Sequence, residues 1–300
     1  MKRVVFPEGE DKRVIWAAKI LKKKKIATPI LIGRKKVENI EVINPDISRD
    51  KEKFAKELSK ITSFPFRTTR NMISHPLYFG AMVLKSNKAE AMVGGCVFTS
   101  GEFITISKQV IGLEKGISVP SSYFLMDIPN YKGGEEGRLI FADASVNPNP
   151  EPQQLADIAI TTAKTAKNFF HWKPKVALLS FSTQGSASHP LVDKVVKATE
   201  IAKKKAPQLA IEGELQADSA LRKEVAERKM QKVGEVGGQA NILIFPNLDA
   251  GNIAYKLTTI LAKASAWGPI LQGFQKPLSD LSRGVKEEEI VEIVKILVKK

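Results

Sequence analysis

The stretch KVALLSFSTQGSASHPLVDKVVKATEIAKKK, residues 175–205, carries the pattern that predicts the fold of this chain. It opens on a nearly continuous hydrophobic run, which is typical of a strand buried on both faces of a mainly parallel sheet. A polar turn rich in serine follows the run, and a helical stretch follows the turn. The stretch therefore predicts a strand, a turn and a helix in that order, as in α/β proteins.

The same alternation recurs over most of the 300 residues. Short hydrophobic runs predict six more strands, at residues 3–7, 28–33, 91–98, 122–128, 138–146 and 240–246. Helical periodicity predicts helices at residues 11–24, 152–169, 191–204, 218–230 and 251–265, and from Lys286 onward. We therefore expect an α/β fold with a largely parallel sheet.

Length and composition limit the class of protein. Three hundred residues with a hydrophobic fraction of 43% suit one large or two medium domains. The proline-rich stretch NPNPEP, residues 147–152, is the predicted boundary between two lobes. No run of about 18 apolar residues occurs, so we expect no transmembrane helix. The N-terminus does not resemble a signal peptide, and one cysteine excludes an internal disulfide framework, so we expect a soluble cytoplasmic protein.

The charge of the chain predicts attraction to anions. Lys and Arg outnumber Asp and Glu by 47 to 32, which gives a net charge of +15. Such a charge suits either nucleic acid or a phosphate-rich small ligand. The lysines are dispersed over predicted helix faces, and no nucleic-acid-reading motif occurs. We therefore expect no nucleic-acid partner and a solvated, lysine-rich surface.

Several common site motifs are absent from the sequence. There is no glycine-rich dinucleotide fingerprint and no P-loop. The three histidines, His75, His171 and His189, are not at metal-ligand spacing, so we expect no metal site. Cys96 lies in the apolar stretch VGGCVF, which favours a small core residue over a nucleophile.

Polar turns follow the predicted strands of the second half. Because ligands of open α/β sheets bind outside the carboxyl ends of the strands, these turns predict one polar cleft. Free backbone N–H groups where such a turn runs into a helix would bind an anion. Each turn alone could also be an ordinary helix cap. The residues concerned are Ser182, Thr183, Gly185 and Ser186, then Glu214, Gln216 and Asp218, and then Asn252, Tyr255 and Lys256.

A further polar turn, Ser282-Arg283-Gly284, precedes the last predicted helix, whose first turn holds three glutamates. Acidic residues there complement the helix dipole. Two interpretations of Arg283 stay open on residue types alone. It is either a solvated loop residue or a member of the polar cleft.

Six motifs, taken together, resemble the phosphate acetyltransferase (phosphotransacetylase) family, of which phosphate butyryltransferase is a close relative. They span almost the whole chain and are specific in the second half. The motifs are VVFPEGEDKRV (4–14), FADASVNPNPEPQQLADIAI (141–160), VALLSFSTQGSA (176–187), EGELQADSAL (212–221), GGQANILIFPNLDAGNIAYKL (237–257) and GPILQGFQKPLSDLSRG (268–284).

The resemblance implies a two-lobed, three-layer α/β/α fold, similar to isopropylmalate dehydrogenase, with an active-site cleft between the lobes. Lobe one would hold residues 1–146 and 270–300, and lobe two residues 147–269. The implied assembly is a homodimer.

The reaction that the resemblance implies is reversible acetyl transfer between CoA and inorganic phosphate, through a ternary complex. Acetyl-CoA and acetyl phosphate are its substrates, and no bound cofactor is expected. The alternatives are a propionyl or butyryl transferase, and a non-catalytic paralogue that binds CoA or acetyl phosphate.

The resemblance also assigns residues. Arg283 would hold phosphate and stabilise the tetrahedral intermediate, and Ser282 would hydrogen-bond the CoA thiol. Glu289 would be the base, at a position where the family usually has aspartate. The expected substrate-binding residues are Ser182, Thr183, Gly185, Ser186, Asn252, Tyr255, Lys256, Thr99 and Ser100.

The first half departs from the family pattern. Thr105 stands where the family typically has an arginine that helps to bind the anionic substrate, and Phe98 replaces a usually polar residue. The segment 61–76 looks shorter than its family equivalent. These departures predict altered acyl specificity, weaker phosphate binding or low activity.

Overall fold

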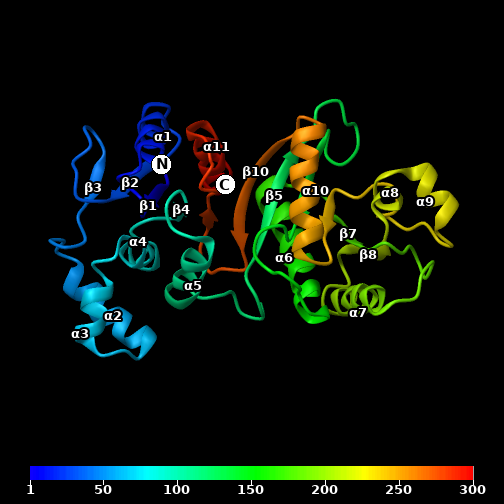
Figure 1. The fold of residues 1–300 in the computed structure, drawn as a ribbon, viewed down its shortest axis with the longest axis horizontal. Coiled ribbons are helices and arrows are strands. Elements are labelled where there is room, and N and C mark those ends of the chain that lie inside the picture. The colour runs from blue at the N-terminus through cyan, green and yellow to red at the C-terminus, as the bar shows by residue number, and fades with distance from the viewer. Residues whose placement is uncertain (300) are drawn as a thin grey trace. The chain divides into compact units, whose positions relative to one another are not determined.

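The computed structural model of the chain describes residues 1–299 and divides into two compact units. Unit 1 comprises Met1–Glu114 and Phe274–Lys300, and unit 2 comprises Lys115–Gly273. Figure 1 shows the course of the chain through both.

Unit 1 is built on a parallel sheet. Neighbouring strands follow the order β3-β2-β1-β4-β11, and every printed pairing among them is parallel. The strands are β1 (Arg3–Phe6), β2 (Thr28–Ile32), β3 (Glu41–Ile43), β4 (Ala91–Gly94) and β11 (Leu278–Asp280). Except for the edge strand β3, they are mostly buried, as continuous hydrophobic runs require.

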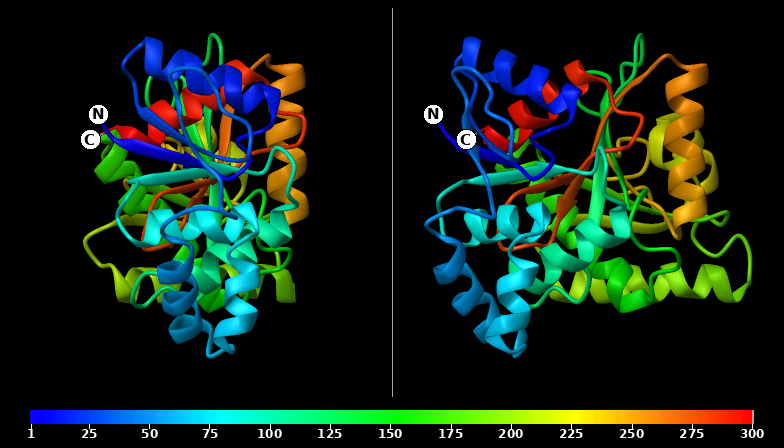
Figure 2. Two further views of the ribbon diagram at one scale, coloured as in Figure 1. Left: turned by 90° about the vertical axis from the view of Figure 1, so that its left-hand side faces the viewer. Right: turned by 60° about the vertical axis from the view of Figure 1, so that its left-hand side comes forward.

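Helices cover both faces of this sheet, so unit 1 is three-layered. One layer holds α1 and α11, which pack together, and the other holds the remaining helices (Figure 2). The helices are α1 (Lys12–Lys23), α2 (Lys51–Thr62), α3 (Phe66–Met72), α4 (Pro76–Lys85), α5 (Ser100–Val110) and α11 (Glu287–Val298).

Unit 2 has a mixed sheet. Its strand order is β10-β5-β6-β9-β7-β8, in which β10, β5 and β6 pair antiparallel and the rest pair parallel. The strands are β5 (Ser121–Asp127), β6 (Arg138–Ala142), β7 (Lys175–Leu179), β8 (Ala210–Leu215), β9 (Ile242–Ile244) and β10 (Ser265–Gln272).

The helices of unit 2 are α6 (Pro152–Phe170), α7 (Pro190–Lys205), α8 (Ala217–Leu221), α9 (Lys223–Lys229) and α10 (Leu248–Leu261). The last three pack small side chains, such as Ala220, Ala226 and Ala254, against the same core cluster as Phe124 and Leu243 of the strands. Helices α6 and α7 pack together.

The α/β fold predicted from the sequence is confirmed, and each of the seven predicted strands overlaps an observed one. The predicted helix 218–230 is instead two helices, because Arg222 adopts extended dihedral angles between α8 and α9. Strands β3, β8, β10 and β11 were not predicted. Strand β8 reads AIEGEL, whose two glutamates and glycine hide its strand character.

The boundary between the units differs from the predicted one. The prediction placed it at residue 147, whereas the compact units divide after Glu114. The reason is that β5 and β6 pair with β10 and β9 of unit 2. The prolines of NPNPEP start a helix instead, with Pro152 in the first turn of α6 and a capping box between Glu151 and Gln154.

Residues 1–299 contain no helix that is both long enough and apolar enough to span a membrane. Over the same residues, no three His, Cys, Asp or Glu side chains gather in a way that could hold a metal ion.

Candidate active site

The carboxyl ends of β1, β4 and β11 lie at one edge of the unit 1 sheet, because these strands are parallel neighbours. The loop after β1 carries Glu8, the loop after β4 carries Cys96, and the loop after β11 carries Ser282 and Arg283. Such an edge is where open α/β sheets bind ligands.

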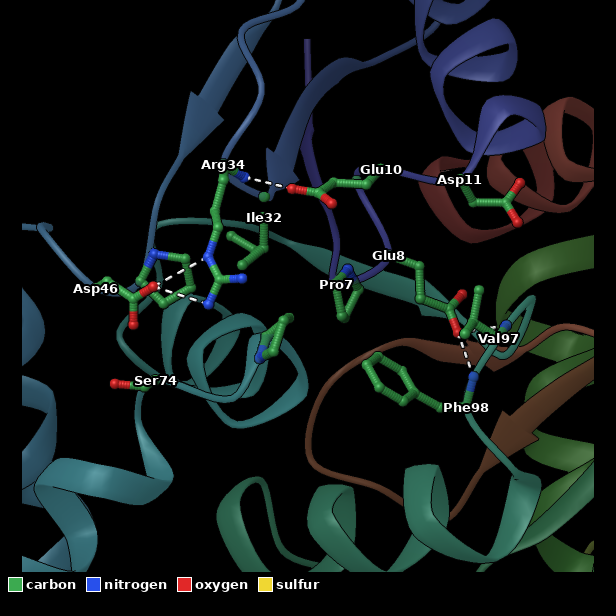
Figure 3. Close-up of a pocket in the computed structure, with 14 residues that line it drawn as sticks. Pro7, Glu8, Glu10, Asp11, Ile32, Arg34, Asp46, Ser74, Val97 and Phe98 are labelled. Atoms are coloured by element: carbon green, nitrogen blue, oxygen red, sulfur yellow. Dashed lines mark hydrogen bonds and ion pairs between the residues drawn. The ribbon is translucent and has the colours of Figure 1, made fainter.

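Glu8 organises the loop after β4. Its buried carboxylate accepts hydrogen bonds from the backbone N–H groups of Cys96 at 2.8 Å, Val97 at 2.7 Å and Phe98 at 2.7 Å. Figure 3 shows this carboxylate pointing into the loop. Three N–H donors supply the negative charge with the partners that a buried carboxylate needs. Glu8 is therefore a structural residue of this edge.

Cys96 is a buried thiol. Burial, together with the charge of Glu8, raises the pKa of Cys96 to about 12. The thiol stays protonated at neutral pH, and a protonated thiol is a poor nucleophile. This agrees with the interpretation of Cys96 as a small core residue.

Thr99 and Ser100 begin α5. Thr99 is the N-cap, and its side chain accepts a hydrogen bond from the Glu102 N–H at 3.3 Å. Ser100 is exposed. Burial raises the pKa of Asp280, at the end of β11, to about 6, an effect that the Ser100 hydroxyl opposes and the charge of Glu8 strengthens.

Ser282 and Arg283 form a tight exposed turn after β11. The Ser282 hydroxyl accepts from the Gly284 N–H at 3.2 Å, and its carbonyl accepts from the Val285 N–H at 3.0 Å. The carbonyl oxygen of Arg283 accepts a hydrogen bond of 2.6 Å from Nη1 of Arg13. The Arg283 backbone is thus held, while its side chain is exposed to solvent.

Glu289 lies in the first turn of α11 and is exposed. Its Oε2 accepts a hydrogen bond of 3.0 Å from the Lys286 N–H, so the carboxylate caps its own helix. The other carboxylate oxygen remains for a second partner, and the assignment of Glu289 as a base stays a prediction.

In unit 2, the turn after β7 is closed around a buried carboxylate. Glu214 Oε1 accepts from the Ser182 hydroxyl at 2.8 Å and from the Gly185 N–H at 2.7 Å. Ser182, Thr183 and Glu214 are buried, whereas Gly185 and Ser186 are exposed. The side chains of Ser182 and Thr183 therefore support the turn from within.

The expectation of free N–H groups in this turn is wrong. The six amides of residues 182–187 all donate within the protein. The acceptors, in chain order, are Ser180 Oγ, Ser186 Oγ, Glu214 O, Glu214 Oε1, Thr183 O and Ser182 Oγ. Buried polar groups need hydrogen-bond partners, and here the protein itself supplies the acceptors for these amides. Helix α7 begins only later, at Pro190.

The polar residues after β8 serve the same turn. The Gln216 N–H donates to the Thr183 hydroxyl at 3.0 Å. Asp218 forms an ion pair with Lys229 at 2.7 Å, which lowers the pKa of Asp218.

The third set of predicted polar residues lies on helix α10. The Asn252 side-chain amide donates to the Ala144 carbonyl at 3.2 Å. The ring of Tyr255 stacks on that of Phe124, with centroids 4.2 Å apart. The ammonium of Lys256 lies 5.1 Å from the centre of the Tyr255 ring and is exposed. Of these three residues, Lys256 offers an exposed charge to a ligand.

A cavity of about 280 Å³ opens in unit 1 beside Glu8, between the loops that follow β1, β2 and β4. Figure 3 shows Pro7, Ile32 and Phe98 around it and the Arg34–Asp46 ion pair on one side. That pair measures 3.0 Å. Sequence analysis did not predict this cavity, because its wall combines residues from loops that are far apart in the chain.

Residues 1–298 match the family model described as Phosphate acetyl/butaryl transferase. This chain belongs to that family.

Relatives of the family cover nearly the whole chain. The phosphate acetyltransferase of Clostridium acetobutylicum is 45% identical over 312 residues, which span 99% of this chain and 93% of that protein. A solved phosphotransacetylase from Streptococcus pyogenes is 39% identical with a TM-score of 0.92, covering 99% and 92% of the two chains. The predicted family and its acyltransferase class are thereby confirmed.

A more distant structure shares the fold alone. Terephthalate 1,2-cis-dihydrodioldehydrogenase from Burkholderia xenovorans is 11% identical with a TM-score of 0.51, covering 99% of this chain and 98% of that one. The predicted likeness to a dehydrogenase fold is consistent with this match.

Two positions at which the resemblance implied a different residue lie on or next to α5. Thr105 is exposed on the helix. The Phe98 ring lies 5.1 Å from the His75 ring, and His75 Nε2 lies 3.5 Å from a Glu102 oxygen. Phe98 thus packs on a histidine instead of offering a polar group.

Three residues of this edge were missed by sequence analysis although the family motifs contain them: Glu8, Arg13 and Asp280. A glutamate between proline and glycine directly after a buried strand was the available signal for Glu8. Nothing local marked Arg13, because its backbone acceptor at Arg283 lies 270 positions away in sequence.

The raised pKa of Asp280 predicts a pH-dependent stability. Between about pH 4 and pH 7 the folded state binds more protons at this carboxyl than the unfolded chain, so rising pH removes stability. Relative to Asp280→Asn, the wild-type free energy of unfolding should fall by roughly 2–3 kcal/mol over this interval. Urea unfolding at several pH values measures it. A pH-independent difference between the two proteins would contradict the raised pKa.

Proposed function

We propose that this protein is a phosphate acetyltransferase, which moves an acetyl group reversibly between CoA and inorganic phosphate. The observation that carries the proposal is the 45% identity to a phosphate acetyltransferase over 99% of the chain. In one direction, acetyl phosphate and CoA give acetyl-CoA and phosphate. We propose a ternary complex with direct transfer, since the single thiol of the chain is buried and protonated.

In this mechanism the sulfur of CoA attacks the carbonyl carbon of acetyl phosphate. The carbonyl π electrons move to oxygen, and a tetrahedral intermediate forms. The intermediate collapses when the bond from carbon to the bridging oxygen breaks and phosphate leaves with that electron pair. Negative charge therefore develops on the carbonyl oxygen and on the leaving phosphate.

Arg283 is the residue that we propose stabilises this charge. It is exposed on a turn whose backbone is held by Arg13, and a guanidinium can donate two parallel hydrogen bonds to a phosphate. A pre-positioned donor stabilises the transition state without reorganising during the reaction. We propose that the exposed hydroxyl of Ser282, the preceding residue, hydrogen-bonds the CoA thiol.

Glu289 is the proposed base for the CoA thiol. A thiol with a pKa of about 8.5 needs only modest help to lose its proton near neutral pH, and a positioned carboxylate suffices. The capping hydrogen bond from Lys286 fixes one oxygen of Glu289. The proton would pass to the other oxygen.

The remaining predicted residues are proposed to bind substrate in two ways. Exposed groups would contact it directly: Thr99, Ser100, Gly185, Ser186 and Lys256. Buried or packed groups would hold those contacts in place: Ser182, Thr183, Asn252 and Tyr255. Lys256 suits the phosphates of CoA because its ammonium is exposed.

A thioester assay with purified protein tests the function directly. With CoA present, acetyl phosphate should give acetyl-CoA, and butyryl phosphate should react with a lower kcat/KM. Preference for butyryl phosphate would instead support the longer-chain transferase. Absence of turnover with either, combined with retained CoA binding, would support the non-catalytic paralogue.

Substitution of Arg283 tests its role. Arg283→Ala should lower kcat by roughly 10²-fold or more, as expected for loss of an oxyanion-type contact. Arg283→Lys keeps the charge but loses the planar fork, so its kcat should lie between alanine and wild type. The CoA dissociation constant should change much less than kcat. Near-normal turnover of Arg283→Ala would remove Arg283 from the mechanism.

We also propose that the protein is a homodimer working in the cytoplasm, where its CoA substrates occur. The structural support for a dimer is an apolar stripe along α10. Its members are spaced as one helical face and are between 50% and 77% exposed: Ile253, Leu257, Ile260 and Leu261. A stripe of this kind favours burial against a second copy over exposure to water.

A charge placed in the stripe should disrupt the dimer. Ile260→Glu should shift the molar mass measured by light scattering toward the monomer. Ile47→Glu in unit 1 is the matched control, because Ile47 is also highly exposed but lies outside this stripe. A wild-type monomer, or an unchanged dimer in Ile260→Glu, would count against this interface.

A further inference from the structure

Arg13 is fully engaged in hydrogen bonds at the edge of the unit 1 sheet. It lies in the first turn of α1 and is partly buried. Its Nε and Nη2 form a fork on the two Asp11 oxygens, at 3.0 and 2.8 Å. Its Nη1 donates to the carbonyls of Arg283 at 2.6 Å and Val285 at 3.3 Å. Its Nη2 also donates to the Cys96 carbonyl at 3.1 Å.

These bonds match all five N–H groups that a guanidinium has. The acceptors come from three segments that are distant in sequence: the start of α1, the loop after β4 and the loop after β11. A lysine has three donors on one atom and no planar fork, so it cannot repeat this pattern.

Asp11 sets the orientation of Arg13. It is the N-cap of α1, and its side chain accepts from the Arg13 N–H at 2.8 Å. The hydrogen bond between the two side chains lowers the pKa of Asp11 and raises the pKa of Arg13. Both groups therefore stay charged across the physiological pH range, and the ion pair between them is present throughout it.

The contact with the β11 loop is made to backbone. Arg13 binds the carbonyl oxygens of Arg283 and Val285 and leaves the Arg283 guanidinium exposed. On the other side of Ser282, the Leu281 N–H donates to the Gly94 carbonyl at 2.5 Å. The turn is thus held on both sides of Ser282.

We propose that Arg13 is a positioning residue for catalysis, which fixes the backbone of Arg283 so that its guanidinium meets the reacting phosphate. This inference rests on the proposed function of Arg283. A displacement of about 1 Å in a group that stabilises a transition state can cost as much as 10²-fold in rate. Loss of Arg13 therefore acts on turnover through Arg283.

Kinetics of single and double variants test the proposal. Arg13→Ala should lower kcat by about 10-fold or more, with a smaller change in KM, because the loss falls on the transition state. Arg13→Lys should recover part of kcat. In the Arg283→Ala background, Arg13→Ala should cause no further loss, since the residue it positions is gone. Lys12→Ala, on the exposed side of the same helix turn, is the control and should keep wild-type kcat.

A structural readout separates this inference from the proposed function. Hydrogen exchange in peptides covering residues 281–286 should be faster in Arg13→Ala than in Lys12→Ala. If Arg283→Ala turns over normally, the proposed function of Arg283 fails, whatever Arg13 does. If Arg283→Ala loses kcat but Arg13→Ala does not, or if the two losses multiply in the double variant, the positioning role of Arg13 is overturned. Unchanged exchange also overturns it, and Arg13→Lys supplies the same tests if Arg13→Ala does not fold.

Discussion

Loops that leave a parallel sheet carry backbone N–H and C=O groups that have lost their ladder partners, and buried groups of this kind must be paired. In unit 1 the loop after β1 and the first turn of α1 together supply both kinds of partner. Glu8 accepts from three consecutive amides of the β4 loop, and Arg13 donates to carbonyls of the β4 and β11 loops. The short motif PEGEDKR thereby joins three loops into one edge, and the exposed turn of Arg283 depends on that edge.

In unit 2 a single carboxylate pairs with the polar groups of the turn after β7. Glu214 collects the Ser182 hydroxyl and the Gly185 amide, and the other amides of the turn close on neighbouring oxygens. These bonds fix the shape of the turn, and they also occupy its N–H donors within the protein. Among the residues of unit 2 that are predicted to bind substrate, Lys256 is the one that carries an exposed charge.

Electrostatics at the unit 1 edge follows from the same pairing. Burial raises the pKa of Asp280 and of Cys96, and the charge of Glu8 raises both further. The charge of Arg13 is matched by Asp11, so the Arg283 guanidinium is left exposed on the turn. In a family whose reaction handles phosphate, an exposed cation on a held backbone is the useful arrangement.

The sequence by itself determined the α/β class, most strands and helices, and the family, because hydrophobic periodicity and motif order are local properties of the chain. Only the tertiary structure decided the roles of particular polar groups. From the sequence, Ser182 and Thr183 could not be told from residues that contact a ligand directly, whereas in the structure both are buried and their hydroxyls pair with Glu214 and with the Gln216 N–H. The boundary between the units at residue 115 and the hydrogen bond from Arg13 to the Arg283 carbonyl likewise could not be predicted from the sequence. Both depend on partners more than a hundred positions away, and no local pattern records which distant backbone group a side chain will meet.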